Sequence, residues 1–294
     1  MATRSTGFQI TARDLEVLTA FDAVPLTADQ LLTFSYTFDQ PFSQLRLVQR
    51  RLQILSRASL VQNFPYAVAS NGRSPHYYKL TRSGYRMLHG FDAVLPKRRY
   101  FERIADNHHF HTRKLAEFLV TLAARCQREG IRLEHLAREN TVAIQTESMT
   151  LYPDAVFRLR LPNGRSFNFV VELDNGTERV RSKKDAESIE RKIRGYDAHQ
   201  STFDVFNPNR YVVLFVTTRS RQRLTHMLTT ARMLMQNPQR RVFLGVCLDE
   251  FLADRRPITK SLFHDVAGRA CPLVAFESDK QSVPTFVTPT VVPC

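Results

Sequence analysis

Three acidic residues and one lysine stand at spacings that could hold a divalent metal against a phosphodiester. Asp154 follows Pro153 at a turn, and Glu172 and Asp174 close an apolar stretch about eighteen residues later. A charged segment farther on carries Lys192. Carboxylate oxygens are the hard ligands that Mg²⁺ and Mn²⁺ prefer, and such an ion polarises a phosphate and activates a bound water. The pattern predicts a metal held by Asp154 and Glu172, with Asp174 and Lys192 as further catalytic candidates.

Two predicted strands, joined by a tight hairpin, would bring the acids together. Pro162-Asn-Gly164 is a turn sequence between a strand at 155–161 and a strand at 167–173. Asp154 and Glu172 then become neighbours across the ladder, at one edge of the sheet. Asp174 shares the face of Glu172, because side chains alternate along an extended strand. A lysine at position 174 would complete such a site, but the chain has an aspartate there.

The lysine would come instead from a helix predicted over about residues 178–198. Lys192 neighbours an apolar stripe that would pack on the sheet and could reach back over the strand ends. The stripe is Ile189, Ile193 and Tyr196. The opposing interpretation is that the acids cap loops and that Lys192 is a solvated side chain. Both interpretations stay open on the residues alone.

The second half of the chain alternates strands with helices. Continuous apolar strands separated by helices are typical of a sheet buried on both faces. Besides the elements above, the pattern predicts helices at 106–129 and 219–236 and strands at 131–136, 141–145, 211–216 and 242–246. We therefore expect an α/β domain around a mixed sheet over residues 106–270, followed by a tail over 271–294.

The first half is predicted to be a winged helix-turn-helix. After a flexible leader at 1–10, Thr11 and Thr27 are cap residues for two helices, and a third helix carries an apolar stripe. Asn71-Gly72 is a hairpin turn signal between two short strands, and Thr81 opens a further helix. Three helices followed by a hairpin indicate a winged helix over 11–95, and a basic linker at 96–105 leads into the second domain.

The third helix presents side chains that suit a DNA major groove. With its apolar stripe inward, the outward residues are Gln44, Arg46, Gln49, Arg50 and Gln53. Arginine can bond guanine in bidentate fashion, and glutamine can bond adenine. Arg73 at the predicted wing tip, with Lys79, Arg82 and Arg86 nearby, is placed for phosphate contacts. The alternative is a solvated helix in a winged helix that binds protein.

Composition favours a polyanionic partner. The 294 residues carry 42 Lys and Arg against 28 Asp and Glu, a formal charge of +14, and residues 1–105 and the remainder each contribute +7. Binding to phosphates releases counterions, so this excess favours double-stranded DNA. The four cysteines have no C-x-x-C spacing, which argues against structural zinc. No signal peptide or membrane-spanning run is recognisable, so we expect a cytoplasmic, nucleoid- or plasmid-associated protein without membrane contact.

At these residues the chain resembles the replication-relaxation family of bacterial plasmids and other mobile elements. The resemblance covers about residues 11–217. Its first motifs are Thr11-x-Arg13-Asp14, Val48-x-x-Arg51-Leu52-x-x-Leu55 and Tyr78-x-Leu80-Thr81-x-x-Gly84. Its later motifs are Pro153-Asp154-Ala155, Glu172-Leu173-Asp174-x-Gly176-Thr177-Glu178 and Lys192-x-x-x-Tyr196.

The resemblance implies a DNA-binding protein whose second half has a restriction-endonuclease-like fold with the PD…(D/E)xK signature. Asp154 and Glu172 match the two metal-binding acids of that signature, whereas Asp174 departs from the expected lysine. Lys192 would take over the lysine role, and Glu139 is a weaker further acid. His108 and His111 share a helix face and are a minor nickel or zinc candidate, although a phosphate contact suits a basic helix entrance better.

Three functions follow from these observations. The first is a DNA-binding protein of a plasmid or other mobile element, acting in replication or relaxation together with DNA or an assembly partner. The second is an active endonuclease dependent on Mg²⁺ or Mn²⁺. The third is a transcriptional regulator whose second domain forms a homodimer.

Overall fold

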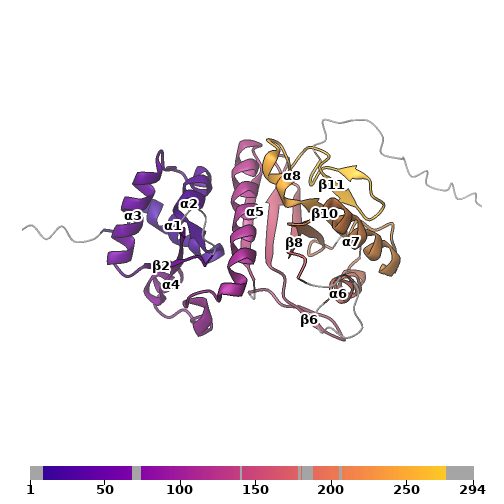
Figure 1. Cartoon of the computed structure of the whole chain (residues 1–294), viewed down its shortest axis with the longest axis horizontal. Coiled ribbons are helices and arrows are strands. Elements are labelled where there is room, and N and C mark those ends of the chain that lie inside the picture. The colour runs from indigo at the N-terminus through magenta and orange to yellow at the C-terminus, as the bar shows by residue number, and fades with distance from the viewer. Residues whose placement is uncertain are drawn as a thin grey trace, which may run out of the picture.

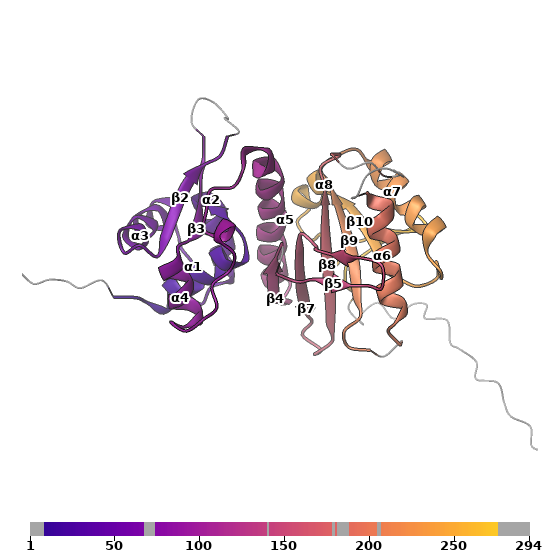
Figure 2. The same ribbon diagram turned by 90° about the horizontal axis from the view of Figure 1, so that it is seen from below.

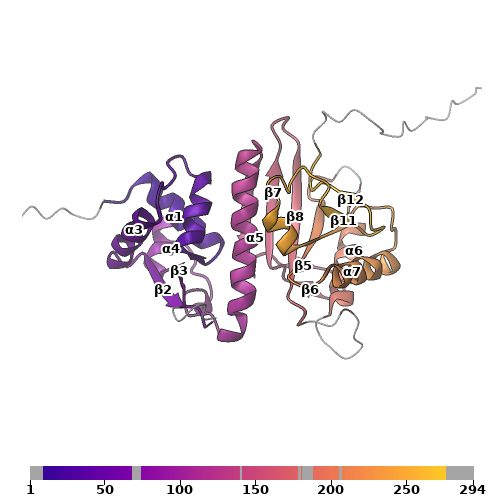
Figure 3. The same cartoon turned by 45° about the horizontal axis from the view of Figure 1, so that its top comes forward.

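The computed structural model describes residues 9–67, 74–139, 141–177, 180, 188–204 and 207–275. It confirms the α/β class, with a seven-stranded mixed sheet in the second half of the chain. A long helix, α5 (His109–Arg128), stands between the N-terminal helices and this sheet (Figures 1 and 3). The predicted leader up to Ile10 and the predicted tail lie largely outside the described residues, as do the turn Asn71-Gly72 and Arg73.

The N-terminal half has the helices and hairpin of a winged helix. Its strands form a three-stranded sheet in the order β1-β3-β2, and β2 and β3 are an antiparallel pair. The elements are α1 (Ala12–Ala23), β1 (Leu26–Thr27), α2 (Ala28–Phe34), α3 (Leu45–Arg57), β2 (Val61–Pro65), β3 (His76–Leu80) and α4 (Arg82–His89). Thr11 and Thr27 cap α1 and α2, as predicted, and both form capping boxes.

A buried ion pair joins the first and third helices. Asp14 is fully buried, and the Arg51 guanidinium clamps both of its carboxylate oxygens, with Nε 2.5 Å from Oδ1. Burial acts to raise the pKa of Asp14, but hydrogen bonds from Arg51 and Thr11 outweigh it and lower the pKa. Two of the N-terminal sequence motifs therefore meet here, and their role is to hold α1 against α3.

Residues 96–105 pack between the two halves. Tyr100 and Phe101 are buried, and Tyr77 of the wing accepts a hydrogen bond from the backbone N–H of Ile104 at 2.9 Å. Lys79 donates to the carbonyl of Glu102 at 2.6 Å. The segment thus ties the wing strands to the start of α5.

The large sheet runs in the order β12-β11-β10-β9-β8-β7-β4. Strands β4, β7 and β8 are antiparallel neighbours, β8, β9 and β10 are parallel, and β11 and β12 return antiparallel. The strands are β4 (Arg132–Arg138), β7 (Ala155–Arg160), β8 (Ser166–Asp174), β9 (Tyr211–Thr217), β10 (Phe243–Cys247), β11 (Phe263–Asp265) and β12 (Ala270–Cys271). A separate small hairpin pairs β5 (Ile144–Gln145) with β6 (Thr150–Leu151).

Helices cover both faces of the large sheet. Helices α5 and α8 (Leu248–Ala253) share one apolar core with the winged helix, while α6 (Ile189–Ser201) and α7 (Arg221–Leu234) pack over a second core. The helix predicted over 178–198 has its described part from Ile189, where the Ser188 side chain caps it. The strand predicted at 141–145 is reduced to two residues, and β11 and β12 were not predicted.

Cys126 and Cys247 are buried free thiols. In the part of the chain that the structure describes, no helix is both long and apolar enough to cross a membrane.

Gly84→Ala is expected to destabilise the winged helix. A Cβ at this position would lie 2.0 Å from the carbonyl oxygen of Leu60, so the backbone of α4 must move, at a cost of about 1–3 kcal/mol or more. Urea unfolding followed by circular dichroism should show a lower midpoint. Ser83→Ala, at an exposed neighbouring position, is the control and should change the free energy of unfolding by less than about 0.5 kcal/mol. An unchanged midpoint for Gly84→Ala would contradict the close packing of α4.

Candidate functional site

Asp154 and Glu172 lie side by side where β7 begins and β8 ends. Ala155 pairs with Val171 across the ladder, so Asp154 is the next residue along and stands opposite Glu172. The backbone N–H of Asp154 donates to the Val171 carbonyl at 3.1 Å, and Asp154 Oδ2 accepts from the backbone N–H of Leu173 at 2.6 Å. The predicted hairpin therefore brings the two acids together.

Glu172 is buried and receives two side chains from α6. Lys192 Nζ lies 2.9 Å from Oε2, and the Tyr196 hydroxyl donates to Oε1. Lys192 and Tyr196 are four residues apart, so they share one face of the helix and reach the same carboxylate. Burial raises the pKa of Glu172 to about 7, against the opposing charge of Lys192. Lys192 contacts Glu172, as predicted. Tyr196, expected only as a core residue, also hydrogen-bonds to Glu172.

Asp154 has a histidine partner that the sequence did not single out for this site. His111, in the first turn of α5, places Nε2 3.1 Å from Asp154 Oδ1. Its Nδ1 lies 3.0 Å from the side-chain nitrogen of Asn175, just beyond β8. Burial acts to lower the pKa of His111, but the bond to Asp154 and the nearby negative charges outweigh it and raise the pKa. The available signal was the histidine-rich start of α5, and only the fold shows that one of these rings meets a carboxylate.

Asp174 lies on the same face of β8 as Glu172 but is held by a different helix. Arg223 of α7 forms a bidentate pair with its carboxylate, at 2.7 and 2.6 Å, and Thr217 donates to it at 2.8 Å. Burial acts to raise the pKa of Asp174, but the bonds from Arg223 and Thr217 outweigh it and lower the pKa. The structure thus separates Asp174, in an arginine pair, from the group around Glu172.

The group around Glu172 has the chemistry for binding a cation or a phosphate. Two carboxylates present oxygen donors, and each oxygen that accepts one hydrogen bond keeps a further lone pair. Among the described residues, no group of three or more His, Cys, Asp or Glu side chains is arranged to hold a metal. Mg²⁺ needs no such cage, because it is usually bound by one or two carboxylates together with water and substrate phosphates. Asp154 and Glu172 therefore supply the one or two carboxylates that such an ion would need.

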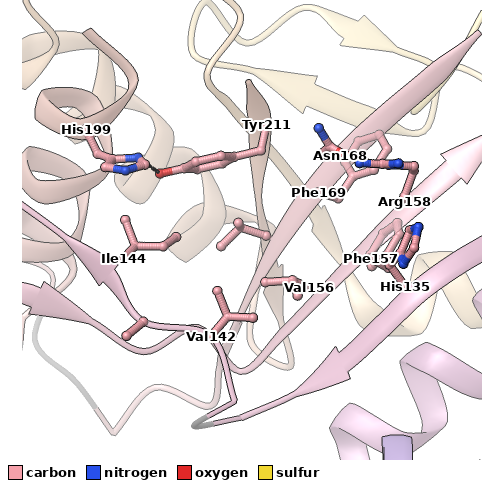
Figure 4. Close-up of a pocket in the computed structure, with 12 residues that line it drawn as sticks. His135, Val142, Ile144, Val156, Phe157, Arg158, Asn168, Phe169, His199 and Tyr211 are labelled. Carbon is pink, nitrogen blue, oxygen red and sulfur yellow. Dashed lines mark hydrogen bonds between the residues drawn. The ribbon is translucent and has the colours of Figure 1, made fainter. Parts of the chain in front are cut away.

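A separate pocket of about 320 Å³ opens on the α6 side of the sheet (Figure 4). Its apolar lining includes Val142, Ile144, Val156 and Val170. Four of its polar residues pair with one another: His199 bonds the Tyr211 hydroxyl at 3.0 Å, and Arg158 donates to Asn168 at 2.9 Å. The lining includes neither Asp154 nor Glu172, although Val156 and Val170 each lie two residues away from one of these acids.

Helix α3 exposes the predicted DNA-reading side chains. Its inner stripe is buried at Val48, Leu52 and Leu55. The opposite face is exposed at each predicted position, namely Gln44, Arg46, Gln49, Arg50 and Gln53. Arg82 and Arg86 are also exposed, whereas Arg73 lies outside the described residues.

The prediction that Lys79 contacts phosphate is wrong. Only 5% of this residue is exposed, and its ammonium is engaged by the Glu102 carbonyl. Burial lowers the pKa of Lys79 to about 8, and the neighbouring charge of Arg138 acts in the same direction. Lys79 therefore stabilises the contact between the wing strand β3 and the segment at 96–105.

The loop end of the wing hairpin is bonded to the helix that carries His111. The backbone N–H of Ala67, just after β2, donates to Nδ1 of the buried His109 at 2.6 Å. The other ring nitrogen of His109 lies 2.9 Å from the Ile104 carbonyl. A single residue separates His109 from His111 in the chain, so the wing and Asp154 contact the same turn of α5.

Arg223→Ala is expected to lower the free energy of unfolding by about 3–5 kcal/mol at neutral pH, because it strips the cation from the buried Asp174. The wild-type pair stabilises the fold above the pKa of an unfolded aspartate, and this contribution is lost as pH falls through the lowered pKa of Asp174. The difference between variant and wild type should therefore shrink on acidification.

Denaturant unfolding at several pH values measures this difference. Arg194→Ala breaks an exposed pair with Glu190 and is the control, with an expected effect below about 1 kcal/mol. Equal effects of the two substitutions at neutral pH would contradict a structural role for the pair between Asp174 and Arg223.

Comparisons with known proteins agree with the motifs that the structure has placed. A family model described as replication-relaxation matches residues 23–213, which is more than half of the chain. No curated protein and no solved structure matches the chain. The matched region includes α3, the wing strands, the paired acids and Lys192. The chain therefore belongs to the replication-relaxation family.

Proposed function

We propose that this protein binds double-stranded DNA through its winged helix and acts in the replication of a plasmid or other mobile element. Family membership indicates a role in such replication. The observation that carries the DNA-binding proposal is the exposed face of α3, where arginines and glutamines alternate on the side opposite the buried stripe. The positive charge of the whole chain supports the same partner.

Within this proposal, α3 enters the major groove and the wing follows the backbone. Arg46 and Arg50 lie one turn apart on α3, so both can face the same groove. Arg51, between the other outward residues, is committed to Asp14 and holds the helix in place. The second domain then engages the same DNA, or a replication partner, at the edge of the sheet that carries Asp154 and Glu172.

A second candidate function, metal-dependent cleavage of DNA, is favoured by the convergence of Asp154, Glu172 and Lys192. Asp154 and Glu172 would hold Mg²⁺ or Mn²⁺, which would supply a Lewis acid for the phosphate and activate a water. Lys192 would stabilise negative charge that develops on the phosphate. Tyr196 and His111 would position the two carboxylates through the bonds described above.

Arg50→Ala should weaken affinity for duplex DNA by about 1–3 kcal/mol, because it removes a groove-facing guanidinium. Fluorescence anisotropy with a labelled duplex containing the target site, or with plasmid fragments, measures the effect. Arg269→Ala removes the same charge at an exposed position near the far edge of the sheet and should leave affinity nearly unchanged. Wild-type affinity should fall steeply with salt, and binding that is absent or insensitive to salt would refute the DNA-binding proposal.

For the cleavage function, the wild-type protein should nick supercoiled plasmid in the presence of Mg²⁺ or Mn²⁺. Asp154→Asn, Glu172→Gln and Lys192→Ala should each reduce nicking by about a hundredfold or more, since each removes a ligand or a charge at the phosphate. Asp249→Asn, at an exposed acid of α8, is the matched control. Intact plasmid under conditions in which the protein demonstrably binds it would exclude cleavage and leave the binding proposal standing.

A further inference from the structure

Two exposed aromatic residues stand close in the chain to His111 and Asp154, which contact each other. Phe110 immediately precedes His111 and is 44% exposed, and Tyr152 lies two residues before Asp154 and is 55% exposed. Most large apolar side chains of the described residues are buried, because exposure of an aromatic ring forfeits its hydrophobic stabilisation. Two such residues, each within two positions of a residue in the same contact, therefore point to a partner that they meet.

The fold places these rings on neighbouring segments. Phe110 belongs to the first turn of α5, and Tyr152 to the segment between β6 and β7. The 3.1 Å approach of His111 to Asp154 joins these two segments. The two aromatic residues therefore lie on the segments that carry His111 and Asp154, and the lining of the apolar pocket includes neither of them.

A positively charged side chain, Lys114, lies beside the Phe110 ring. Lys114 lies one turn after Phe110 on α5, with its ammonium 5.9 Å from the centre of the Phe110 ring. The same lysine contacts Glu117 at 2.8 Å, so its position is held while about a quarter of its side chain remains exposed. An aromatic ring beside a cation suits a nucleotide, whose base stacks and whose phosphate pairs with the charge.

DNA bound by the winged helix would extend toward Phe110 and Tyr152. The Ala67 bond to His109 links the loop end of the wing hairpin to the turn that carries Phe110. In Figure 2 the strands β2 and β3 rise toward the same side of the molecule as the beginning of α5. A duplex held by α3 and the wing would therefore continue toward the carboxylates.

We propose that Phe110 and Tyr152 stack on unpaired bases, so that the carboxylate site takes DNA with a single-stranded segment next to a duplex. This inference rests on the proposed DNA-binding function and names its substrate class. In an intact duplex the bases are stacked within the helix and offer no face to a protein ring, whereas an unpaired strand offers one at every nucleotide. The duplex part is held by the winged helix, and the unpaired part passes the rings.

Binding of two labelled DNA probes tests the proposal. One probe is a blunt duplex, and the other is the same duplex with a single-stranded overhang of about ten nucleotides, a length within the site size of known single-strand binders. The wild type should bind the overhang probe more tightly. The double substitution Phe110→Ala and Tyr152→Ala should weaken binding of the overhang probe by at least about fivefold and change binding of the blunt probe by less than about twofold, because only an unpaired base loses a stacking partner.

A fluorescence measurement reports the stacking directly. The chain contains no tryptophan, so Tyr152→Trp introduces a single tryptophan at the proposed position. Its emission should be quenched by the overhang probe and not by the blunt probe. Phe91→Trp, at a ring position that is 79% exposed after α4, is the control and should respond equally to both probes.

The outcomes separate this inference from the function on which it rests. A wild type that binds neither probe would refute DNA binding, and the inference would fall with it. Tight binding of both probes without preference, with the emission of the Tyr152→Trp variant unaffected by the overhang, would overturn the inference alone. Thermal unfolding of the double variant at the wild-type temperature excludes misfolding as the cause of weaker binding.

Discussion

The packing of α5 on both of its sides is the constraint on which the rest of the structure depends. A helix at the surface of a domain buries one stripe, but α5 buries half of its twenty residues, which include Leu115, Phe118 and Leu122. One side contacts α2 of the winged helix, and the other contacts the sheet and α8 within the same apolar core. Because both halves pack on α5, the position of the wing relative to the paired acids is fixed. His109 bonds the wing at Ala67, and His111 contacts Asp154.

The buried carboxylates fall into two kinds according to the cation that meets them. Asp14 and Asp174 are clamped in bidentate fashion by Arg51 and Arg223, and in both the arginine bonds outweigh burial and lower the pKa. Glu172 instead meets a lysine and a tyrosine, and burial raises its pKa to about 7. Planar arginine forks satisfy both oxygens of a carboxylate and fix it, whereas an ammonium is a point charge that leaves lone pairs accessible. The first arrangement suits a structural pair, and the second suits a centre that exchanges partners with a ligand.

Much of the fold could be predicted from local patterns. The capping boxes at Thr11 and Thr27, the strand at His76–Leu80 and the apolar strands of the sheet each carry a signal within a few residues. The hairpin at Gly164, which has the positive φ of 83° that a tight turn requires, placed Asp154 opposite Glu172. Elements with weak or short patterns, such as β11 and β12, were missed because strands of three and two residues are too short to show a period.

For the candidate site, the sequence by itself determined the two acids, their register and the helix that presents Lys192, because turn chemistry and side-chain periodicity are local properties. Only the tertiary structure decided which charges meet. It assigned Asp174 to Arg223, Lys79 to the packed segment at 96–105, and His111 to Asp154, through contacts that span dozens of residues. Such contacts depend on how helices cross a sheet and on which groups are shielded from water together, and no periodicity in a single stretch of chain records that arrangement.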